Sequence, residues 1–256
     1  EGRHEVCGVF TREDKPVGRK QVLTAPPAKQ VALAHGLPVF QPKTLRSGEA
    51  ADILRGLAPQ LIVVVAYGRI LPPDILALPQ YGCINLHVSL LPKYRGAAPI
   101  QRAVLNGDTV SGVTTMRLDK GMDTGDMYFS ESVEIGENTT TGELFDTLAE
   151  IGGKLLVKTV DALENGSAVL TAQDHAVATH ADKITPEECL VDFSLPAREV
   201  HNRIRGLSPF PGAFSYLNGK TVKLYDSRLN DEKEQSAPFG TVLEASRDGV
   251  VVACGI

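Results

Sequence analysis

At 256 residues the chain is long enough for one large domain or two smaller ones, and its 43% hydrophobic and 22% charged residues are ordinary for a globular protein. A formal net charge of −5 argues against a dedicated nucleic-acid-binding protein, and no run of eighteen apolar residues predicts a membrane-spanning helix. The four cysteines are scattered without CxxC or metal-ligand spacing, so in a chain with no secretory signal we expect reduced, mostly buried thiols and no metal site.

Basic residues are concentrated near the start of the chain. Residues 12–46 hold seven Lys or Arg and two Asp or Glu, a local charge of +5 within a chain of −5. A basic arm on an acidic body can dock phosphates, and an ordinary solvated loop is the alternative interpretation.

The first part of the chain alternates predicted strands and helices. We expect a strand at 6–10, a Pro-, Lys- and Arg-rich loop at 11–27, a helix at 28–35, a strand at 38–40, a helix at 48–57, a strand at 61–66 and a helix near 76–78. Gly36 is the expected C-terminal cap of the first helix. The segment 61–66 is apolar on both faces, as is typical of a parallel strand buried between helix layers. The alternation predicts an α/β fold with a mostly parallel sheet.

Residues 84–89 continue the alternation as a strand whose two faces differ. Aliphatic side chains alternate with Asn85, His87 and Ser89, so one face carries an amide, an imidazole and a hydroxyl. A donor amide beside a titratable imidazole can stabilise an oxyanion and move a proton, which acyl-type transfer requires. The alternative is an ordinary pair of hydrogen-bonded strand residues.

The remaining elements are a helix at 99–106, strands at 113–118 and 127–135, a long helix that begins at a Thr140–Glu143 capping box, a polar segment at 165–196, a helix at 197–205 and short strands from 208 onward.

The turn between the two middle strands supplies an acid, Asp123, which can orient His87 and stabilise its charged form. Asp119 and Asp126 fit better as plain turn residues. Arg95 is either an anion ligand or a surface charge, and no glycine-rich nucleotide motif is present.

Three segments of the sequence, taken together, are typical of one protein family. They are Ile-Asn-Leu-His-x-Ser-Leu-Leu-Pro-x-Tyr-Arg-Gly-Ala-Ala-Pro-Ile at 84–100, Gly-Val-Thr at 112–114 and Leu-Asp-x-Gly-Met-Asp-Thr-Gly-Asp at 118–126. The combination resembles the formyltransferases that use 10-formyltetrahydrofolate and, among them, the methionyl-tRNA formyltransferases. The resemblance continues at 64–72, 204–205 and 209–214, so it covers nearly the whole chain.

The resemblance implies a doubly wound, mostly parallel formyltransferase domain at 1–183, a linker at 184–207 and a small OB-like β-barrel domain at 208–256. It also implies that the family's first strand and the end of the barrel are absent from this sequence, so we expect apolar sheet edges to be exposed. Val88 stands where the family usually has Gly or Ala, and in a regular strand its side chain points away from Asn85 and His87.

The resemblance further implies transfer of a formyl group from 10-formyltetrahydrofolate to the α-amine of methionyl initiator tRNA. Asn85, His87 and Asp123 are then the catalytic residues: the first two stabilise the tetrahedral oxyanion, and Asp123 sets the tautomer of His87 and relays the amine proton through water. Ser89 supports them. The residues expected to bind the folate are Tyr67, Gly68, Ile70, Leu71, Ser89, Leu90, Leu91, Pro92, Gly121 and Met122. Those expected to bind the tRNA are Lys15, Arg19, Lys20, Lys220 and Lys223, with Arg228 a further candidate.

Three alternatives remain open at the level of the sequence. A formyltetrahydrofolate hydrolase or dehydrogenase-type domain uses the same three residues to pass the formyl group to water, and a sugar-amine N-formyltransferase passes it to another amine. The third is an inactive RNA-binding paralogue. The family suggests a monomer, located in the bacterial cytoplasm or in a mitochondrion or plastid.

Overall fold

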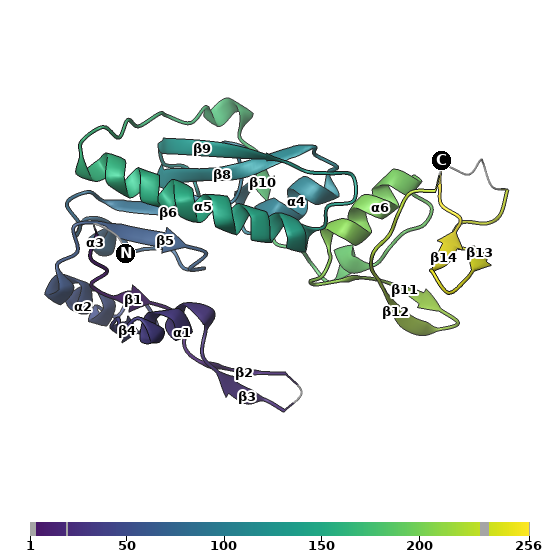
Figure 1. Ribbon diagram of the computed structural model, residues 1–256, viewed down its shortest axis with the longest axis horizontal. Helices are drawn as coiled ribbons and strands as arrows, with labels where there is room; N and C mark the ends of the chain where they lie inside the picture. Colours follow the sequence, from purple (N-terminus) through teal and green to yellow (C-terminus); the bar gives the residue numbers. More distant parts are fainter. Residues whose placement is uncertain (1–3, 19, 231–235, 256) are drawn as a thin grey trace. The chain divides into compact units, whose positions relative to one another are not determined.

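The computed structural model describes residues 4–18, 20–230 and 236–255. The chain divides into two compact units: unit 1 comprises residues 1–86 and 116–126, and unit 2 comprises residues 87–115 and 127–256. A four-stranded sheet has the strand order β5-β6-β8-β9 (Figure 1). The boundary between the units passes through strands β6 (Cys83–His87) and β8 (Val110–Arg117).

The elements of unit 1 follow the predicted alternation. They are β1 (Val9–Phe10), β2 (Lys15–Val17), β3 (Val22–Thr24), α1 (Pro27–Ala34), β4 (Val39–Phe40), α2 (Glu49–Leu57), β5 (Ile62–Val65) and α3 (Pro73–Leu76). Strands β1 and β4 pair in parallel, as do β5 and β6, which confirms the parallel pairing expected of this part of the chain. Gly36 follows α1 with a φ of +68°, the left-handed conformation expected of a glycine cap.

The prediction of a loop at 11–27 is wrong at 15–17 and 22–24, which are strands. Strands β2 and β3 form an antiparallel hairpin, which Figure 1 shows extended away from β1, β4 and α1. Every residue of both strands is exposed. A two-stranded hairpin with no buried face gives no alternation of apolar and polar residues, so the pattern did not reveal it.

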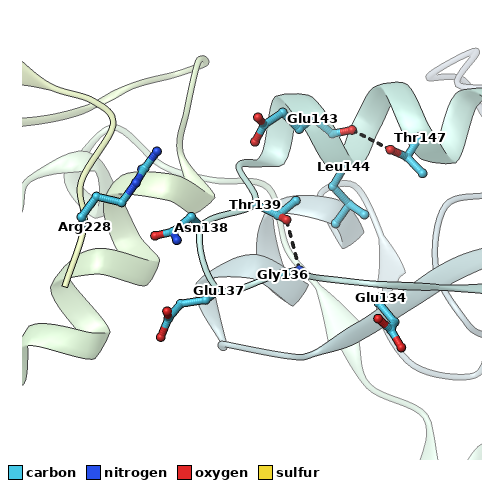
Figure 2. Close-up of a pocket in the computed structure, with 9 residues that line it drawn as sticks. All are labelled: Glu134, Gly136, Glu137, Asn138, Thr139, Glu143, Leu144, Thr147 and Arg228. Atoms are coloured by element: carbon cyan, nitrogen blue, oxygen red, sulfur yellow. Dashed lines mark hydrogen bonds between the residues drawn. The ribbon is translucent and has the colours of Figure 1, made fainter.

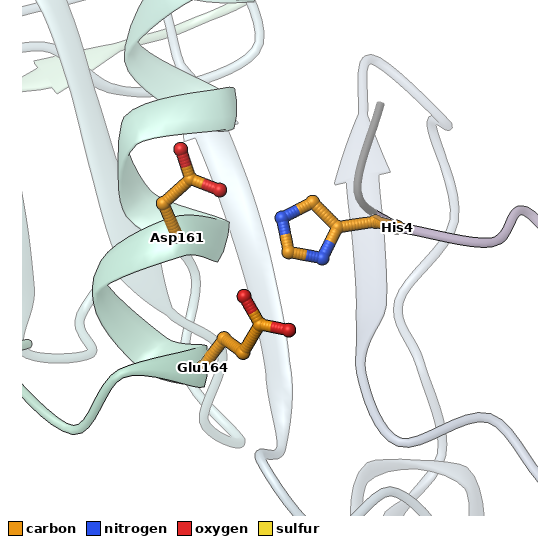
Figure 3. A group of neighbouring side chains, drawn as sticks. All are labelled: His4, Asp161 and Glu164. Atoms are coloured by element: carbon orange, nitrogen blue, oxygen red, sulfur yellow. The ribbon is translucent and has the colours of Figure 1, made fainter. Parts of the chain in front are cut away.

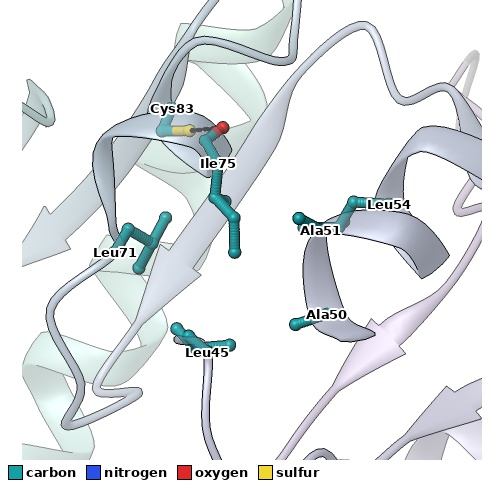
Figure 4. Close-up of a cluster of buried hydrophobic side chains, with 7 residues drawn as sticks. All are labelled: Leu45, Ala50, Ala51, Leu54, Leu71, Ile75 and Cys83. Atoms are coloured by element: carbon teal, nitrogen blue, oxygen red, sulfur yellow. Dashed lines mark hydrogen bonds between the residues drawn. The ribbon is translucent and has the colours of Figure 1, made fainter. Parts of the chain in front are cut away.

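The core of unit 1 packs α2 and α3 against one face of β5. Its buried side chains, drawn in Figure 4, are Leu45, Ala50, Ala51, Leu54, Leu71, Ile75 and Cys83. Ile62 and Val64 pack against this cluster, whereas Val63 and Val65 are 45% and 51% exposed. The prediction that both faces of this strand are buried is therefore wrong. Alternate residues point to opposite faces of a strand, and the helices of unit 1 cover only one of them.

Unit 2 is built around the long helix. Its main elements are β7 (Arg95–Gly96), α4 (Pro99–Leu105), β9 (Met127–Glu134), α5 (Thr141–Glu164), β10 (His180–Ala181) and α6 (Ala197–Gly206), with short 3-10 helices at His175–Val177 and Glu187–Cys189. Helix α5 runs along β9 (Figure 1). It begins at the predicted capping box, and its buried residues include Leu144, Leu148 and Leu155.

The C-terminal part of unit 2 contains the predicted short strands. They are β11 (Ala213–Leu217), β12 (Lys220–Leu224), β13 (Val242–Ala245) and β14 (Val250–Val252). Among the described residues they form two separate antiparallel pairs, β11 with β12 and β13 with β14. A second buried cluster joins this part to α6 and includes Cys189, Ile204 and Leu207. None of the described helices has both the length and the apolar character needed to cross a membrane.

Candidate active site

The polar face of β6 carries the two residues that the alternation predicted. Asn85 pairs with Val64 of β5 in unit 1, and His87 ends the strand in unit 2. His87 is only 5% exposed, and its Nε2 lies 2.8 Å from the carbonyl oxygen of Tyr94. A carbonyl oxygen can only accept a hydrogen bond, so Nε2 carries a hydrogen and donates it.

The turn after β6 is closed by hydroxyl groups. Ser89, 1% exposed, donates from Oγ to the carbonyl oxygen of Lys93 at 2.7 Å. Thr114 Oγ1 donates to the carbonyl oxygen of Ser89 at 2.7 Å and accepts from the backbone N–H of Leu91 at 3.2 Å. Within unit 2, the Ser89 hydroxyl therefore holds the turn that follows His87.

Tyr94 lies in this turn with a backbone φ of +60°. Its hydroxyl donates to Asp108 at 2.8 Å and accepts from the side-chain amide of Asn106 at 2.9 Å. Burial raises the pKa of the Tyr94 hydroxyl, and the hydrogen bond to Asp108 also favours its neutral form. The residue is anchored at both its backbone and its ring.

Arg95 is not a surface charge, which corrects one of the two interpretations of the sequence. Its guanidinium is buried and donates to Gln173 Oε1 at 3.1 and 2.7 Å and to His175 Nδ1 at 3.0 Å. The next residue, Gly96, has a φ of +116°, and a Cβ at that position would lie 2.9 Å from the carbonyl oxygen of Ala181. Gly96 therefore lies close against the backbone of β10.

In unit 1 the turn at 119–126 has a defined conformation. Asp119 Oδ1 accepts from the backbone N–H of Gly121 at 2.9 Å and from Thr124 Oγ1 at 2.8 Å, so its prediction as a turn residue is confirmed. The backbone N–H of Leu118 donates to the carbonyl oxygen of Cys83 at 2.8 Å, which ties the start of the turn to β6. Asp123 has a φ of +54°, a left-handed conformation that Asp adopts more readily than most residues.

The predicted folate residues of unit 1 differ widely in exposure. Tyr67 has a buried hydroxyl with no hydrogen-bond partner among the described residues, and burial raises its pKa. Ile70 is 72% exposed, whereas Leu71 belongs to the hydrophobic core. The Arg69 guanidinium lies 6.0 Å from the Tyr67 ring and donates to the carbonyl oxygen of Pro42 at 3.0 Å.

A pocket of about 630 Å³ lies beside the 119–126 turn in unit 1. Its lining residues are Pro73, Leu76, Ala77, Gly82, Cys83, Arg117, Leu118, Asp119, Lys120, Gly121, Gly125 and Asp126. Only Gly121 among these was predicted to bind folate. The others include Lys120 and Asp126, of which the sequence analysis named only Asp126, as a turn residue. Burial raises the pKa of the Cys83 thiol to about 12, so this group is a neutral part of the wall.

A second pocket, of about 550 Å³, lies at the start of α5 in unit 2 (Figure 2). Its lining includes three carboxylates, two of which already have partners. Glu143 accepts from the backbone N–H of Thr140 at 2.8 Å, and Glu137 forms an ion pair with Arg198 at 2.6 Å. The sequence did not predict this pocket.

Asp161 and Glu164 present their carboxylates from the last turns of α5 (Figure 3). His4, drawn in the same view, belongs to unit 1. Because these three potential metal donors divide between the two units, they define no metal site within either unit.

The predicted tRNA-binding residues are mostly exposed. Lys15 lies on β2 and Lys20 in the hairpin turn, whereas Arg19 lies outside the described residues. Lys220 begins β12 and is exposed. Lys223 has intramolecular partners instead: its ammonium donates to the carbonyl oxygens of Pro211 and Gly212 at 3.2 and 2.8 Å. It also lies 5.4 Å from the centre of the Phe214 ring.

The class of the protein follows from family comparisons. Residues 1–160 match the family model described as "Formyl transferase", and residues 183–256 match "Formyl transferase, C-terminal domain". Together these matches cover most of the chain, which is therefore a member of the formyl transferases.

Comparisons with individual relatives define the family of this chain more narrowly. It is 46% identical to the methionyl-tRNA formyltransferase of Alkaliphilus oremlandii, over 98% of this chain and 81% of that protein. It is 48% identical to the methionyl-tRNA formyltransferase of Desulfotalea psychrophila, over 99% of this chain and 78% of that one. The chain belongs to the methionyl-tRNA formyltransferase family.

Solved structures share the fold at low sequence identity. The N-formyltransferase from Helicobacter canadensis, in complex with folinic acid and dTDP-3-aminofucose, has a TM-score of 0.69 at 21% identity and covers 95% of this chain and 87% of that one. HypX from Aquifex aeolicus, in complex with tetrahydrofolic acid, has a TM-score of 0.65 at 19% identity, over 87% and 38% of the two chains.

Proposed function

We propose that this protein transfers the formyl group of 10-formyltetrahydrofolate to the α-amine of methionyl initiator tRNA. The observation that carries the proposal is the identity of 46% or more to two methionyl-tRNA formyltransferases over nearly the whole chain. The pairing of an amide and an imidazole on one face of β6 supports it, because this chemistry suits the transfer of a formyl group between nitrogens.

The reaction needs a base and an oxyanion site but no covalent intermediate on the protein. The substrate amine attacks the formyl carbon, a new C–N bond forms, and the bond from that carbon to N10 of the donor breaks. Asn85 and His87 stabilise the oxygen that becomes negative, and Asp123 relays the amine proton through water toward the departing N10. Ser89 acts indirectly, since its hydroxyl holds the turn after His87.

For the donor we propose a site made of main-chain groups near Tyr67–Leu71 and at Gly121 and Met122. The pocket beside the 119–126 turn and the buried Tyr67 hydroxyl, which lacks a protein partner among the described residues, support this assignment. HypX was solved with tetrahydrofolic acid and the Helicobacter protein with folinic acid, so folates bind two proteins of this fold.

For the tRNA we propose contacts from Arg19, from Lys15 and Lys20 on the hairpin, and from Lys220 on the C-terminal strands. Exposed cations suit phosphates, and the described ones of this set are exposed. We do not extend the assignment to Lys223, because its ammonium is bound to two backbone carbonyl oxygens. We propose a division of the chain at 1–183, 184–207 and 208–256; the two family matches cover 1–160 and 183–256.

The test is formylation of charged initiator tRNA by His87→Ala and Asp123→Ala variants, with His180→Ala as a matched exposed-histidine control. We expect turnover to fall by at least about 10²-fold in the first two variants, as for loss of a positioned acid–base group, and tRNA affinity to persist. Unchanged turnover would remove these residues from the mechanism. Formyl recovered only as formate would instead indicate the hydrolase activity.

A further inference from the structure

The imidazole of His87 is bound to a backbone oxygen that residue patterns do not reveal. Nε2 lies 2.8 Å from the carbonyl oxygen of Tyr94, and the imidazole is 5% exposed. Since the carbonyl cannot donate, Nε2 is the protonated ring nitrogen, and exchange of a proton by the ring takes place at Nδ1.

The carbonyl is directed toward His87 because Tyr94 has a left-handed backbone. Its φ of +60° is uncommon for a bulky L-residue. Three contacts within unit 2 hold it there: the backbone N–H donates to Thr179 Oγ1 at 2.9 Å, the hydroxyl donates to Asp108 at 2.8 Å, and Asn106 donates to the hydroxyl at 2.9 Å.

The residue that follows Tyr94 is also held by several hydrogen bonds. The backbone N–H of Arg95 donates to the carbonyl oxygen of Thr179 at 2.9 Å, and the buried Arg95 guanidinium is bound by Gln173 and His175. The Tyr94 peptide therefore has anchors at its own ring, at its nitrogen and at the following residue.

We propose that Tyr94 is a positioning residue for formyl transfer, whose carbonyl oxygen accepts from Nε2–H of His87 and fixes the plane of its ring. Because Nε2–H is already bound, Nδ1 is the ring nitrogen that gains a proton and, as Nδ1–H, donates to the oxyanion. The inference rests on the proposed role of His87 in the reaction. The resemblance gives the setting of the tautomer to Asp123, whereas we assign it to the carbonyl oxygen of Tyr94, which lies in the same unit as His87.

A matched pair of variants tests the anchor. Thr179→Val removes the acceptor of the Tyr94 N–H without a change in size, whereas Thr179→Ser keeps the hydroxyl, and Thr179 is exposed, so both leave the core intact. Tyr94→Phe removes the hydroxyl contacts independently. The measurements are kcat, KM for both substrates, and ¹⁵N NMR of the ring nitrogens, with the His87 signals assigned by their loss in His87→Ala.

We expect Thr179→Val and Tyr94→Phe to convert the Nε2–H pattern of His87 into a mixture with the Nδ1–H form. Their kcat should fall by about tenfold to hundredfold, as expected for a misplaced reacting group, at unchanged KM. Thr179→Ser should match the parent protein in both readouts.

A His87 ring that stays in the Nε2–H form in both variants overturns the inference, whether or not kcat falls. If Thr179→Val is unfolded by circular dichroism, Tyr94→Phe alone decides. If His87→Ala keeps its turnover, the proposed catalytic role of His87 fails, but the ring spectra still report whether Tyr94 sets the tautomer.

Discussion

At the scale of single residues, burial decides which thiols can react. Cys83 is 2% exposed, and burial raises its pKa to about 12, whereas Cys7 is half-buried. At pH 8 roughly one Cys83 in 10⁴ is a thiolate, the form that attacks alkylating reagents. We expect iodoacetamide to label Cys7 in the native protein and Cys83 only after denaturation, as measured by peptide mass spectrometry. Equal labelling rates in the native protein would contradict this assignment.

Two lysines on one strand, Lys220 and Lys223, have separable roles. Lys220 is exposed, so Lys220→Ala should weaken tRNA binding and reduce its salt dependence by about one counterion without a change in Tm. Lys223 binds the carbonyl oxygens of Pro211 and Gly212, so Lys223→Ala should lower stability by about 1 kcal/mol and leave the salt dependence alone. Filter binding at several salt concentrations and thermal unfolding separate the two. A reversal of the two phenotypes would show that Lys223 is the phosphate contact.

At the scale of elements, the start of α5 depends on a local signal. Thr140 Oγ1 accepts from the backbone N–H of Glu143 at 3.3 Å, and Glu143 accepts in return from the backbone N–H of Thr140 at 2.8 Å. We expect Thr140→Ala to lower the free energy of unfolding by about 1 kcal/mol and Thr140→Ser to leave it nearly unchanged. Urea denaturation of the three proteins checks this, and equal losses in both variants would mean that the methyl group, not the hydroxyl, matters.

The elements that the sequence predicted well are those with local causes. A capping box and a 3.6-residue period are enough to place α5, and two strands with a turn are enough to place β8 and β9. The exposure of Val63 and Val65 depends instead on which layers cover β5, and the hairpin at 15–24 depends on pairing with no buried face. Neither is encoded by the alternation of apolar residues alone.

Some features of the candidate site were also predictable from local sequence patterns, and others were not. Alternation along 84–89 was enough to place Asn85 and His87 on one strand and facing one way. The carbonyl oxygen that binds His87 was not predictable, because Tyr94 at a positive φ carries no residue-type signature. The partners of Lys223 were also hidden, since a backbone acceptor looks the same for every residue.

At the scale of the whole molecule, a buried histidine joins distant parts of unit 2. His201 on α6 is 2% exposed. Its Nε2 donates to the carbonyl oxygen of Glu137 before α5 at 2.9 Å, and its Nδ1 accepts from the hydroxyl of Ser227 after β12 at 2.8 Å. In this arrangement the ring is neutral; in a charged ring Nδ1–H would donate instead, and the Ser227 hydroxyl would have to turn and accept.

This histidine makes the stability of the protein depend on pH. Burial lowers the pKa of His201, and the nearby Arg205 and Arg198 lower it further, while the carbonyl of Glu137 and its carboxylate oppose them. The unfolded chain, with a His pKa of about 6.5, therefore binds a proton more readily than the folded one. The contribution of His201 is complete above about pH 6.5 and is lost as the pH falls below it, by at most about 1.4 kcal/mol per pH unit.

We expect the free energy of unfolding in urea to fall between pH 7.5 and pH 5.5 and expect part of that slope to disappear in His201→Gln. Glutamine can donate to Glu137 and accept from Ser227 but does not titrate in this range, so it isolates the charge from the packing. His180→Gln, at an exposed position, should keep the parent slope. An identical slope in His201→Gln and the parent protein would show that other groups titrate, and that His201 holds α6, Glu137 and Ser227 together equally well when it is charged.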